Sequence, residues 1–326
     1  MGLELHGRTR LALALCLLWF ATGCSLLRHG GSDEPSTRSP GWSAHLALPS
    51  PDGRHVAFIG TRASGGIQQH LLLTGGHPLD LTPTGANVHA FAWMPTSDSL
   101  LIAYSTGTRV SGHAARFALV DLDGRVTRRL HVDQQVEGDY GLAVDPAGTY
   151  ALFPAREPGP FEGPTTLWRI DLGSGAMTAV PMRGTKASVQ VSPSFMDRRH
   201  VAFGAGAPTW EAGGANGWIA LLDVDTGEVK RLTPPDQTAG TPTVAPGGRF
   251  IVYDAFPGNH RSQSSLWYVP RHGAASPAML IEDPAGRTPA LDAGGKSVLL
   301  VDAGSPGDRS QIRRMRVPED APWLSN

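Results

Sequence analysis

The fold of this chain follows from one stretch of sequence, Ser50-Pro51-Asp52-Gly53-Arg54-His55-Val56-Ala57-Phe58. Pro51 presets φ for a tight turn, and Gly53 accepts the positive φ that other residues avoid. The apolar run that begins at Val56 is typical of a buried strand. The stretch therefore predicts a tight turn that leads into a strand of the core.

The same pattern of turn and strand returns five more times along the 326 residues. Each copy has one anchor residue in its turn, which is proline in the first five copies and alanine in the last. The anchors are Pro51, Pro95, Pro146, Pro193, Pro246 and Ala293, so successive copies lie 44, 51, 47, 53 and 47 residues apart. A period of about 40–55 residues with strand-turn-strand content is typical of a β-propeller.

The second half of each repeat carries two further strands around an Asp/Gly turn, as residues 117–127 and 167–175 show clearly. The composition agrees, because 40 glycines, 27 prolines and only 17% charged residues favour many short strands joined by turns. No sustained helical periodicity follows the first 30 residues. We therefore predict an all-β fold, a six-bladed β-propeller of four-stranded antiparallel blades.

The sequence is compatible with two ways of closing this ring. The sixth repeat ends near Val317 after only three recognisable strands. Either the segment around residues 39–43 pairs with it and removes an exposed sheet edge, or the last blade stays three-stranded.

The repeat resembles that of the TolB-type WD40-like (PD40) family, which reads roughly W-S-P-D-G, then I-A-F, then L-T. The resemblance rests on residues 50–58 and their later copies, and it covers residues 43 to 317. It implies a propeller domain at 43–318, followed by a C-terminal tail at 319–326. TolB itself carries an additional N-terminal domain, in whose place this chain has a short polar stretch. Propellers host many unrelated activities, so the resemblance predicts the fold more than the function.

The first residues, 1–23, are expected to form a lipoprotein signal peptide. Arg8 and Arg10 supply its positive start, and Leu11 to Phe20 form an uncharged apolar stretch that is short for a bilayer span. Ala21-Thr22-Gly23-Cys24 resembles the bacterial lipobox, in which the cysteine is lipidated and becomes the new N-terminus. An ordinary secretory signal with an incidental cysteine is the alternative.

Residues 24–42 are polar and rich in Gly, Ser and Pro, and we expect them to form a flexible tether. Cleavage before Cys24 removes Cys16, the other cysteine of the chain, so no internal disulfide is expected. Ser25 after the modified cysteine resembles the pattern of lipoproteins sorted to the outer membrane. These features predict a lipid-anchored protein of the bacterial cell envelope that faces the periplasm from the outer membrane.

The charge balance and the missing motifs exclude several classes of function. A formal net charge of −1 gives no reason to expect nucleic acid as a partner. His-Glu-x-x-His, P-loop, paired-cysteine and Gly-x-Ser-x-Gly motifs do not occur. The stretch Asp223–Glu228 is similar to a calcium loop, but Gly227 stands one place early, which favours a hairpin turn. We therefore predict no catalytic residue, metal or cofactor.

The connections after the second strand of each repeat are long and differ among themselves, and they should lie together on one face, the loop face. Varied loops on a rigid scaffold are where binding usually resides. The expected partner-binding residues are Trp210, Phe161, Arg156, Arg109 and Arg261, with the two aromatic residues as hot spots. The alternative is that each aromatic side chain covers its own blade.

One further column of residues stands six positions before each anchor, where the inner strands should reach the mouth of the channel. The column comprises His45, His89, Tyr140, Ala187, Gly240 and Arg287. Histidines from adjacent blades, with Tyr140 beside them, could contribute to a metal or acid–base site. A convincing site needs three or four ligands and the column holds no carboxylate, so ordinary polar strand ends are the preferred interpretation.

Two functional hypotheses from different classes remain. The first is a non-enzymatic, lipid-anchored envelope protein that binds another envelope protein through the loop face, a role that the family resemblance implies. The second is a lyase or hydrolase that acts on a polysaccharide or peptidoglycan fragment at the channel mouth, using His45, His89 and Tyr140. A bound metal that is lost in a His45→Ala variant would favour the second hypothesis.

Overall fold

The computed structural model of the chain is built from β-strands. It describes residues 34–37, 41–62, 68–74, 78–106, 116–132, 137–138, 141–156, 165–185, 188–206, 217–256, 264–273, 276–282, 284, 286–302 and 310–325. Within these ranges every regular element is a strand. A search of the same ranges found no helix of the length and apolarity that crossing a bilayer requires.

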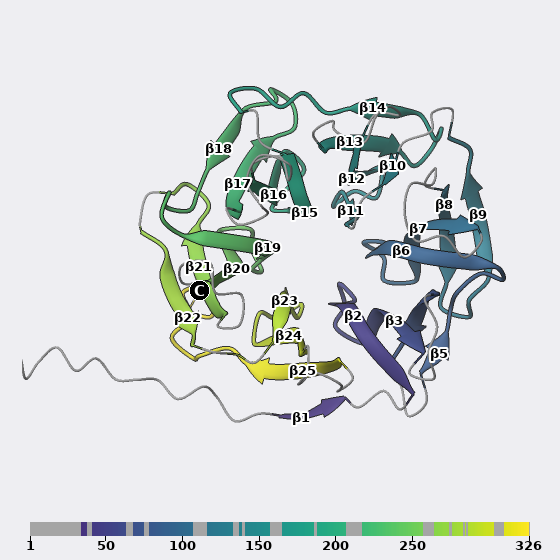
Figure 1. Ribbon diagram of the computed structural model, residues 1–326, viewed down its shortest axis with the longest axis horizontal. Helices are drawn as coiled ribbons and strands as arrows, with labels where there is room; N and C mark the ends of the chain where they lie inside the picture. Colours follow the sequence, from purple (N-terminus) through teal and green to yellow (C-terminus); the bar gives the residue numbers. More distant parts are fainter. Residues whose placement is uncertain are drawn as a thin grey trace, which may run out of the picture.

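The strands form six antiparallel sheets arranged as blades around a central axis, so the prediction of a six-bladed propeller is confirmed (Figure 1). Blade 1 comprises β2 (Trp42–Pro49), β3 (Val56–Arg62), β4 (Gln69–Leu73) and β5 (Leu79–Asp80). Blade 2 comprises β6 (Ala86–Trp93), β7 (Ser99–Thr106), β8 (Arg116–Asp121) and β9 (Val126–Leu130). Blade 3 comprises β10 (Glu137–Gly138), β11 (Ala143–Val144), β12 (Tyr150–Arg156), β13 (Thr166–Asp171) and β14 (Met177–Ala179).

The second half of the ring repeats this arrangement. Blade 4 comprises β15 (Ser188–Phe195), β16 (His200–Gly206), β17 (Gly217–Asp223) and β18 (Val229–Arg231). Blade 5 comprises β19 (Thr238–Val244), β20 (Phe250–Phe256), β21 (Ser265–Pro270) and β22 (Ala278–Ile281). Blade 6 comprises β23 (Arg287–Leu291), β24 (Ser297–Asp302), β25 (Gln311–Arg316) and β1 (Glu34–Thr37). The first strand of each blade faces the axis, and in blade 3 β10 and β11 share this position as two separate pairings with β12.

The turn that repeats between the first two strands has the predicted geometry in blade 1. Gly53 has a φ of +73°, and its N–H donates a hydrogen bond to the Ser50 carbonyl oxygen (2.9 Å). The Asp52 carboxylate accepts hydrogen bonds from the Arg54 N–H (3.0 Å) and the Ser50 hydroxyl (2.6 Å). The side chain of the aspartate thus caps the turn that the glycine makes possible.

The ring closes through β1, which pairs antiparallel with β25, and Glu34 stands opposite Arg314. The last blade is therefore four-stranded, and the alternative of a three-stranded blade is wrong. The closing strand lies at residues 34–37, a few residues before the segment around 39–43 that we expected to pair. It falls within the range 24–42 for which the sequence predicted a flexible tether.

The last described residues, in the range 319–326 predicted as a tail, pack against the base of blades 5 and 6. Trp323 is buried, and its indole N–H donates to the Gly295 carbonyl oxygen (2.9 Å). Its ring lies 6.0 Å from the ring of Phe250 and 5.8 Å from that of Tyr268, measured between centroids. The C-terminal residues thus extend the core of blades 5 and 6.

The hydrophobic core is divided among the junctions between blades. In the part of the chain that the structure describes, each of six apolar clusters joins two neighbouring blades. In the cluster between the last and first blades, Leu299 and Ile312 pack with Phe58 and Leu72. Each blade therefore buries both of its faces, which requires a complete ring.

Neighbouring blades also approach closely at their turns. Gly227, in the β17–β18 turn of blade 4, has a φ of +75°, and its N–H donates to the Asp223 carbonyl oxygen (2.8 Å). A Cβ atom placed on Gly227 would lie 2.7 Å from the Pro181 carbonyl oxygen, at the end of blade 3. Only glycine combines this backbone conformation with this contact between blades.

We predict that Gly227→Ala destabilises the fold more than Gly247→Ala does. Gly247 also has a positive φ (+82°), but a Cβ there would meet no atom within 4 Å. Both variants bear the left-handed backbone cost of roughly 1–2 kcal/mol. Only Gly227→Ala adds overpacking against Pro181, of roughly 1–3 kcal/mol. Urea denaturation of both variants measures the difference, and equal unfolding free energies would contradict this account of the blade junction.

Candidate functional site

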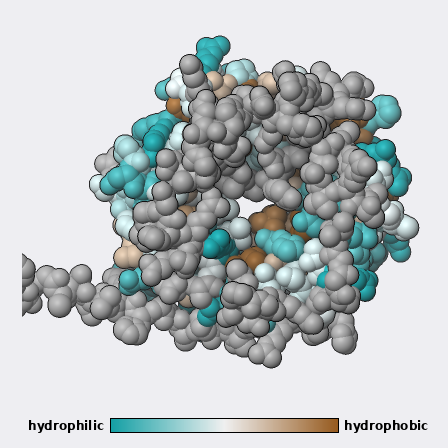
Figure 2. Space-filling view, viewed as in Figure 1, coloured by the Kyte–Doolittle hydropathy of each residue, from teal (hydrophilic) through white to brown (hydrophobic). Residues whose placement is uncertain are grey.

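The inner strands of the propeller enclose a central channel of about 840 Å³. All six blades contribute to its wall, and the anchor residues Pro51, Pro95, Pro146 and Ala293 line it at the end where the tight turns lie. In the space-filling view, both hydrophobic and hydrophilic residues are visible through the central opening (Figure 2). All six repeats meet in this channel, and it is the candidate site.

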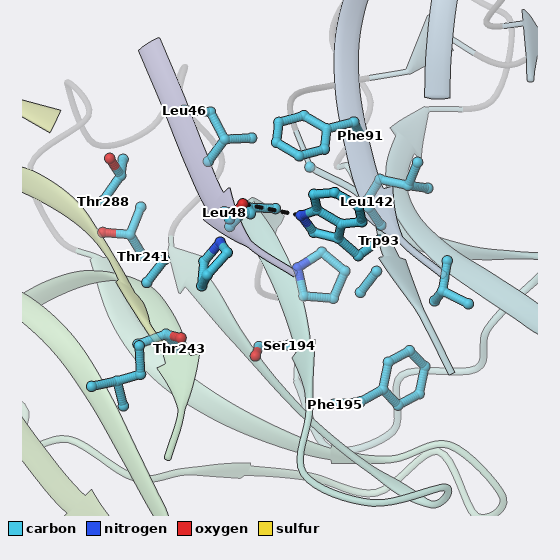
Figure 3. A pocket seen from close by; sticks show the side chains of 18 of the residues that line it. Leu46, Leu48, Phe91, Trp93, Leu142, Ser194, Phe195, Thr241, Thr243 and Thr288 are labelled. Atoms are coloured by element: carbon cyan, nitrogen blue, oxygen red, sulfur yellow. Dashed lines mark hydrogen bonds between the residues drawn. The ribbon is translucent and has the colours of Figure 1, made fainter. Parts of the chain in front are cut away.

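The channel has two chemically different walls (Figure 3). The wall from blades 1 to 3 is largely apolar, with Leu46, Leu48, Phe91, Trp93 and Leu142, and it also holds His45, Gln69 and His89. The Trp93 indole N–H does not point into the channel as a free donor, because it donates to the Leu48 carbonyl oxygen of the neighbouring blade (3.0 Å). The polar end of the indole is thus satisfied, and the ring contributes apolar surface.

The opposite wall, from blades 5 and 6, presents hydroxyl groups. Thr241 and Thr243 come from β19 and Thr288 comes from β23 (Figure 3). Thr241 (φ 33°) and Thr288 (φ 54°) are two of the three non-glycine residues with positive φ in the described chain. Both lie at β-bulges, where the pairing between the first and second strands of the blade shifts its register. These bulges determine how the two threonines are placed in the wall.

Bulges also place the two histidines of the predicted column. The register of β2 shifts around His45 and that of β6 shifts around His89. His45 Nε2 lies 3.2 Å from Thr61 Oγ1, and His89 Nε2 lies 2.8 Å from Ser105 Oγ. Each ring thus contacts a hydroxyl on the second strand of its own blade, sixteen residues further along the chain. Burial lowers the pKa of His45, which favours its neutral form.

In blade 4 the turn predicted at Pro193 is wrong. The sequence places a turn at Pro193, but β15 continues to Phe195, and the turn occupies residues 196–199. The register of β15 shifts between Val189 and Val191. The backbone position that corresponds to the two histidines is therefore residue 190, and Ala187 lies outside the described residues.

An acidic residue that the sequence analysis missed lies behind the hydroxyl wall. Asp254 is the fifth residue of β20 and is only 3% exposed. Eight residues after the anchors of blades 1, 2 and 6, the corresponding positions hold Ile59, Ala103 and Val301. In the sequence, the signal for this residue is a carboxylate within the otherwise apolar run Phe250–Phe256.

Asp254 connects the hydroxyl wall to the predicted channel-mouth residue of blade 6. Thr241 donates its hydroxyl hydrogen to Asp254 Oδ1. Burial raises the pKa of Asp254 to about 6, while the Thr241 hydroxyl and the charge of Arg287 act in the opposite direction. The Arg287 guanidinium carbon lies 5.7 Å from the centre of the Phe256 ring. Arg287 is thus held beside the end of β20, close enough to act on the buried carboxylate.

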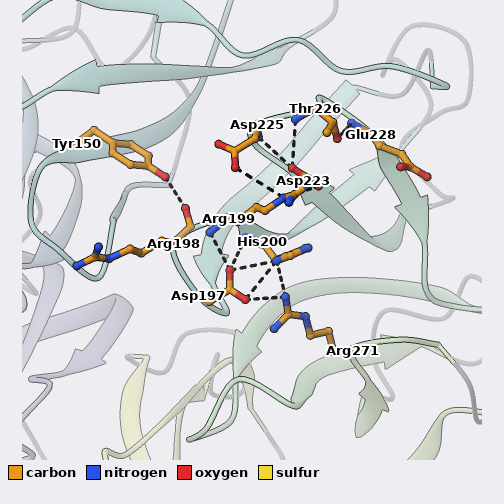
Figure 4. A network of polar contacts seen from close by, with 10 residues as sticks. All are labelled: Tyr150, Asp197, Arg198, Arg199, His200, Asp223, Asp225, Thr226, Glu228 and Arg271. Atoms are coloured by element: carbon orange, nitrogen blue, oxygen red, sulfur yellow. Dashed lines mark hydrogen bonds and ion pairs between the residues drawn. The ribbon is translucent and has the colours of Figure 1, made fainter.

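A second polar cluster lies at the turns of blades 3 to 5 (Figure 4). The Arg271 guanidinium pairs with Asp197 Oδ2 (2.6 Å), and His200 Nδ1 lies 3.1 Å from Asp197 Oδ1. Burial opposes the charge of Asp197, but the N–H groups of Arg199 and His200 and the nearby Arg271 hold its pKa at about 2. These groups are occupied with one another and link blades 4 and 5, so the cluster is a structural connection between blades.

Most of the predicted site residues fall outside the described part of the chain. These are Cys24, Trp210, Phe161, Arg109, Arg261, Tyr140 and Ala187. The backbone of Arg156 ends β12, and its side chain is not described. Within the described ranges, no three His, Cys, Asp or Glu side chains gather as metal ligands would.

Comparison with known proteins identifies the architecture. Neither any family model nor any curated protein matches the sequence. TolB from Acinetobacter baumannii is similar in structure, with 18% identity and a TM-score of 0.52 over 76% of this chain, which spans 56% of the TolB chain. An oligogalacturonate lyase in complex with manganese is similar over 89% of this chain and 99% of its own, with 14% identity and a TM-score of 0.56. The GH74 xyloglucanase of Xanthomonas campestris aligns with 14% identity and a TM-score of 0.55, over 86% of this chain and 55% of that one. At these identities the likeness establishes the fold alone.

We predict that Asp254→Asn stabilises the protein above pH 6 and has little effect near pH 4. The folded-state pKa of about 6 lies above the ordinary value of 3.8. The ionised form is therefore disfavoured in the fold, and stability is lost as pH rises through this range. The gap of about two pKa units corresponds to about 3 kcal/mol.

Urea denaturation at pH 4 and pH 7.5 measures this effect as the difference between variant and wild type. The matched control is Asp236→Asn, which changes an exposed carboxylate. Its unfolding free energy should equal that of the wild type at both pH values. An Asp254→Asn variant whose stability follows that of the wild type at both pH values would contradict the assigned ionisation.

Proposed function

We propose that this protein is a non-enzymatic, lipid-anchored protein of the bacterial cell envelope whose propeller serves as a protein-binding platform. The observation that carries the proposal is the topology of the blades. The second strand of every blade ends on the same side of the ring. The connection that follows has 6 to 10 residues, so six long and dissimilar loops start from one rigid rim.

The loop face is the proposed docking surface, and another envelope protein is the proposed partner. Trp210 and Phe161 are its proposed anchors, because aromatic residues dominate the binding energy of protein interfaces. Arg109, Arg156 and Arg261 supply positive charge around them. The structural likeness to TolB supports this proposal, because protein binding is the role that the resemblance to TolB-type propellers implies.

The N-terminal segment supports the proposed location. Its lipobox-like Ala21-Thr22-Gly23-Cys24 would leave Cys24 as the lipidated N-terminus, with Ser25 next to it. The closing strand β1 begins at Glu34, so about ten residues would separate the lipid from the ring. A flexible chain of that length reaches roughly 15–20 Å, which would keep the propeller next to the membrane on its periplasmic side, most simply at the outer membrane.

A second candidate function is a lyase or hydrolase that acts on a polysaccharide or peptidoglycan fragment at the channel mouth. The observation in its favour is that the similar oligogalacturonate lyase aligns over 99% of its own chain. A single propeller can therefore make up nearly the whole chain of a protein named oligogalacturonate lyase. Against it, His45 and His89 each contact a hydroxyl of their own blade, and the neighbouring wall is largely apolar.

We predict that crosslinking the lipidated protein in cells, followed by mass spectrometry, yields one dominant envelope protein. In the double variant Trp210→Ala/Phe161→Ala, the yield of this crosslink should fall at least fivefold, because the proposed anchors are gone. The matched control is Arg54→Ala/Arg125→Ala, which changes two exposed residues in turns on the opposite face and should keep the yield within twofold. Equal yields in both double variants would contradict docking at the loop face.

We predict no turnover when the purified protein is incubated with oligogalacturonate, with or without Mn²⁺. Elimination from a uronide leaves a conjugated double bond, so absorbance in the ultraviolet reports lyase activity directly. Activity that requires Mn²⁺ and is lost in His45→Ala would overturn the binding proposal and establish the second candidate.

A further inference from the structure

The described lining of the channel holds no acidic side chain, lysine or arginine. Among the described lining residues, the ionisable side chains are His45 and His89, and burial lowers the pKa of His45. An anionic ligand would lose its hydration in this channel without finding a positive charge among the described lining residues, and it would lie near the Asp254 carboxylate behind Thr241, which is costly. The lining therefore favours a neutral molecule over an anionic one.

Two threonines of the channel wall donate their hydroxyl hydrogens to the protein itself. Thr288 donates to the Arg287 carbonyl oxygen (2.7 Å), and Thr241 donates to Asp254. Each hydroxyl oxygen keeps lone pairs that can accept a hydrogen bond. A ligand that engages either oxygen must therefore bring a donor.

One further acceptor is buried at the edge of the apolar wall. Gln69 lines the channel at the start of β4, and its Oε1 atom is buried with no hydrogen-bond partner among the described residues. The Gln69 backbone N–H, by contrast, donates to Asn87 Oδ1 (2.7 Å), which fixes this residue against blade 2. A buried oxygen without a partner loses free energy unless a ligand or a water molecule donates to it.

We propose that the channel is a binding site for a neutral, largely apolar small molecule that carries hydrogen-bond donors. Its apolar body lies against the wall formed by Leu46, Leu48, Phe91 and Leu142. Its donors face the Thr243 hydroxyl or the Gln69 amide oxygen. The volume of about 840 Å³ lies within the range of pockets that hold drug-sized ligands. This site is separate from the proposed loop-face platform and needs no protein partner.

Three related probes test the two chemical requirements of the site. N-phenyl-1-naphthylamine is neutral, apolar and carries one N–H donor. Its N-methyl derivative lacks the donor, and its 8-sulfonate carries a negative charge on the same rings. We expect the parent amine to bind with one-to-one stoichiometry, followed by its fluorescence enhancement at pH 7.5. The N-methyl derivative should bind about fivefold to tenfold more weakly, and the sulfonate should bind more weakly than either.

Two variants locate the bound probe. Ala143→Trp, on β11, fills the channel from blade 3, and its matched control Ala179→Trp adds the same side chain on the exposed outer strand of the same blade. Thr243→Trp fills the channel from the opposite wall. We expect the affinity of the parent amine to fall at least tenfold in both channel variants and to stay within twofold of the wild type in Ala179→Trp. Thermal denaturation identifies a variant that fails to fold. If one channel variant fails to fold, the probe affinity of the other channel variant tests the site.

The outcomes separate this proposal from the loop-face proposal. Unchanged affinity in the folded channel variants, absence of binding of the parent amine, or equal affinity for the sulfonate would each overturn the channel site. Binding of oligogalacturonate in place of the amine would overturn it as well and would support the second candidate function. Crosslinking of the protein partner in Ala143→Trp tests the platform independently, because that variant leaves the loop sequences unchanged.

Discussion

The junction between the last and first blades is the constraint on which the rest of the structure depends. There, β1 pairs with β25, while Phe58 and Leu72 of blade 1 pack with Leu299 of blade 6. Each of the other five apolar clusters also joins two blades, so no blade has a core of its own. Burial of both faces of a blade is complete only when the ring is closed. The short segment before the first blade therefore has a structural role that its polar composition conceals.

The same inner strands that complete the ring also determine the chemistry of the channel. Residues at bulges, where pairing with the second strand shifts, present their side chains differently from residues in regular pairing. The bulges at His45 and His89 place imidazole rings beside hydroxyls, whereas those at Thr241 and Thr288 place threonines in the channel lining whose hydroxyls bond to the protein itself. Because the repeats differ in sequence at this one position, a nearly symmetric scaffold encloses a channel with two unlike walls.

Among the described core residues, Asp254 is the clearest example of a side chain that lowers the stability of the fold. A carboxylate stands where other blades have apolar side chains, and its burial raises its pKa to about 6. Its contacts are directed at the wall of the channel, through Thr241, and at Arg287. Departures of this kind are commonly found where a protein has a function to serve, and this one adjoins the channel that we propose as a binding site.

The repeat, the number of blades and the tight turns were predictable from the sequence because they depend on local features. These features are the spacing of anchors such as Pro51, the positive φ of Gly53 and apolar runs of strand length. The sequence-based prediction is less complete for the rest of the structure. It failed where the outcome depends on contacts between distant residues. The turn of blade 4 lies three residues beyond Pro193, because pairing with β16 extends β15. The closing strand could not be located either, since its partner lies nearly 280 residues away and its own composition is that of a tether. The two walls of the channel emerge only when six strands meet at one axis, which no local pattern encodes.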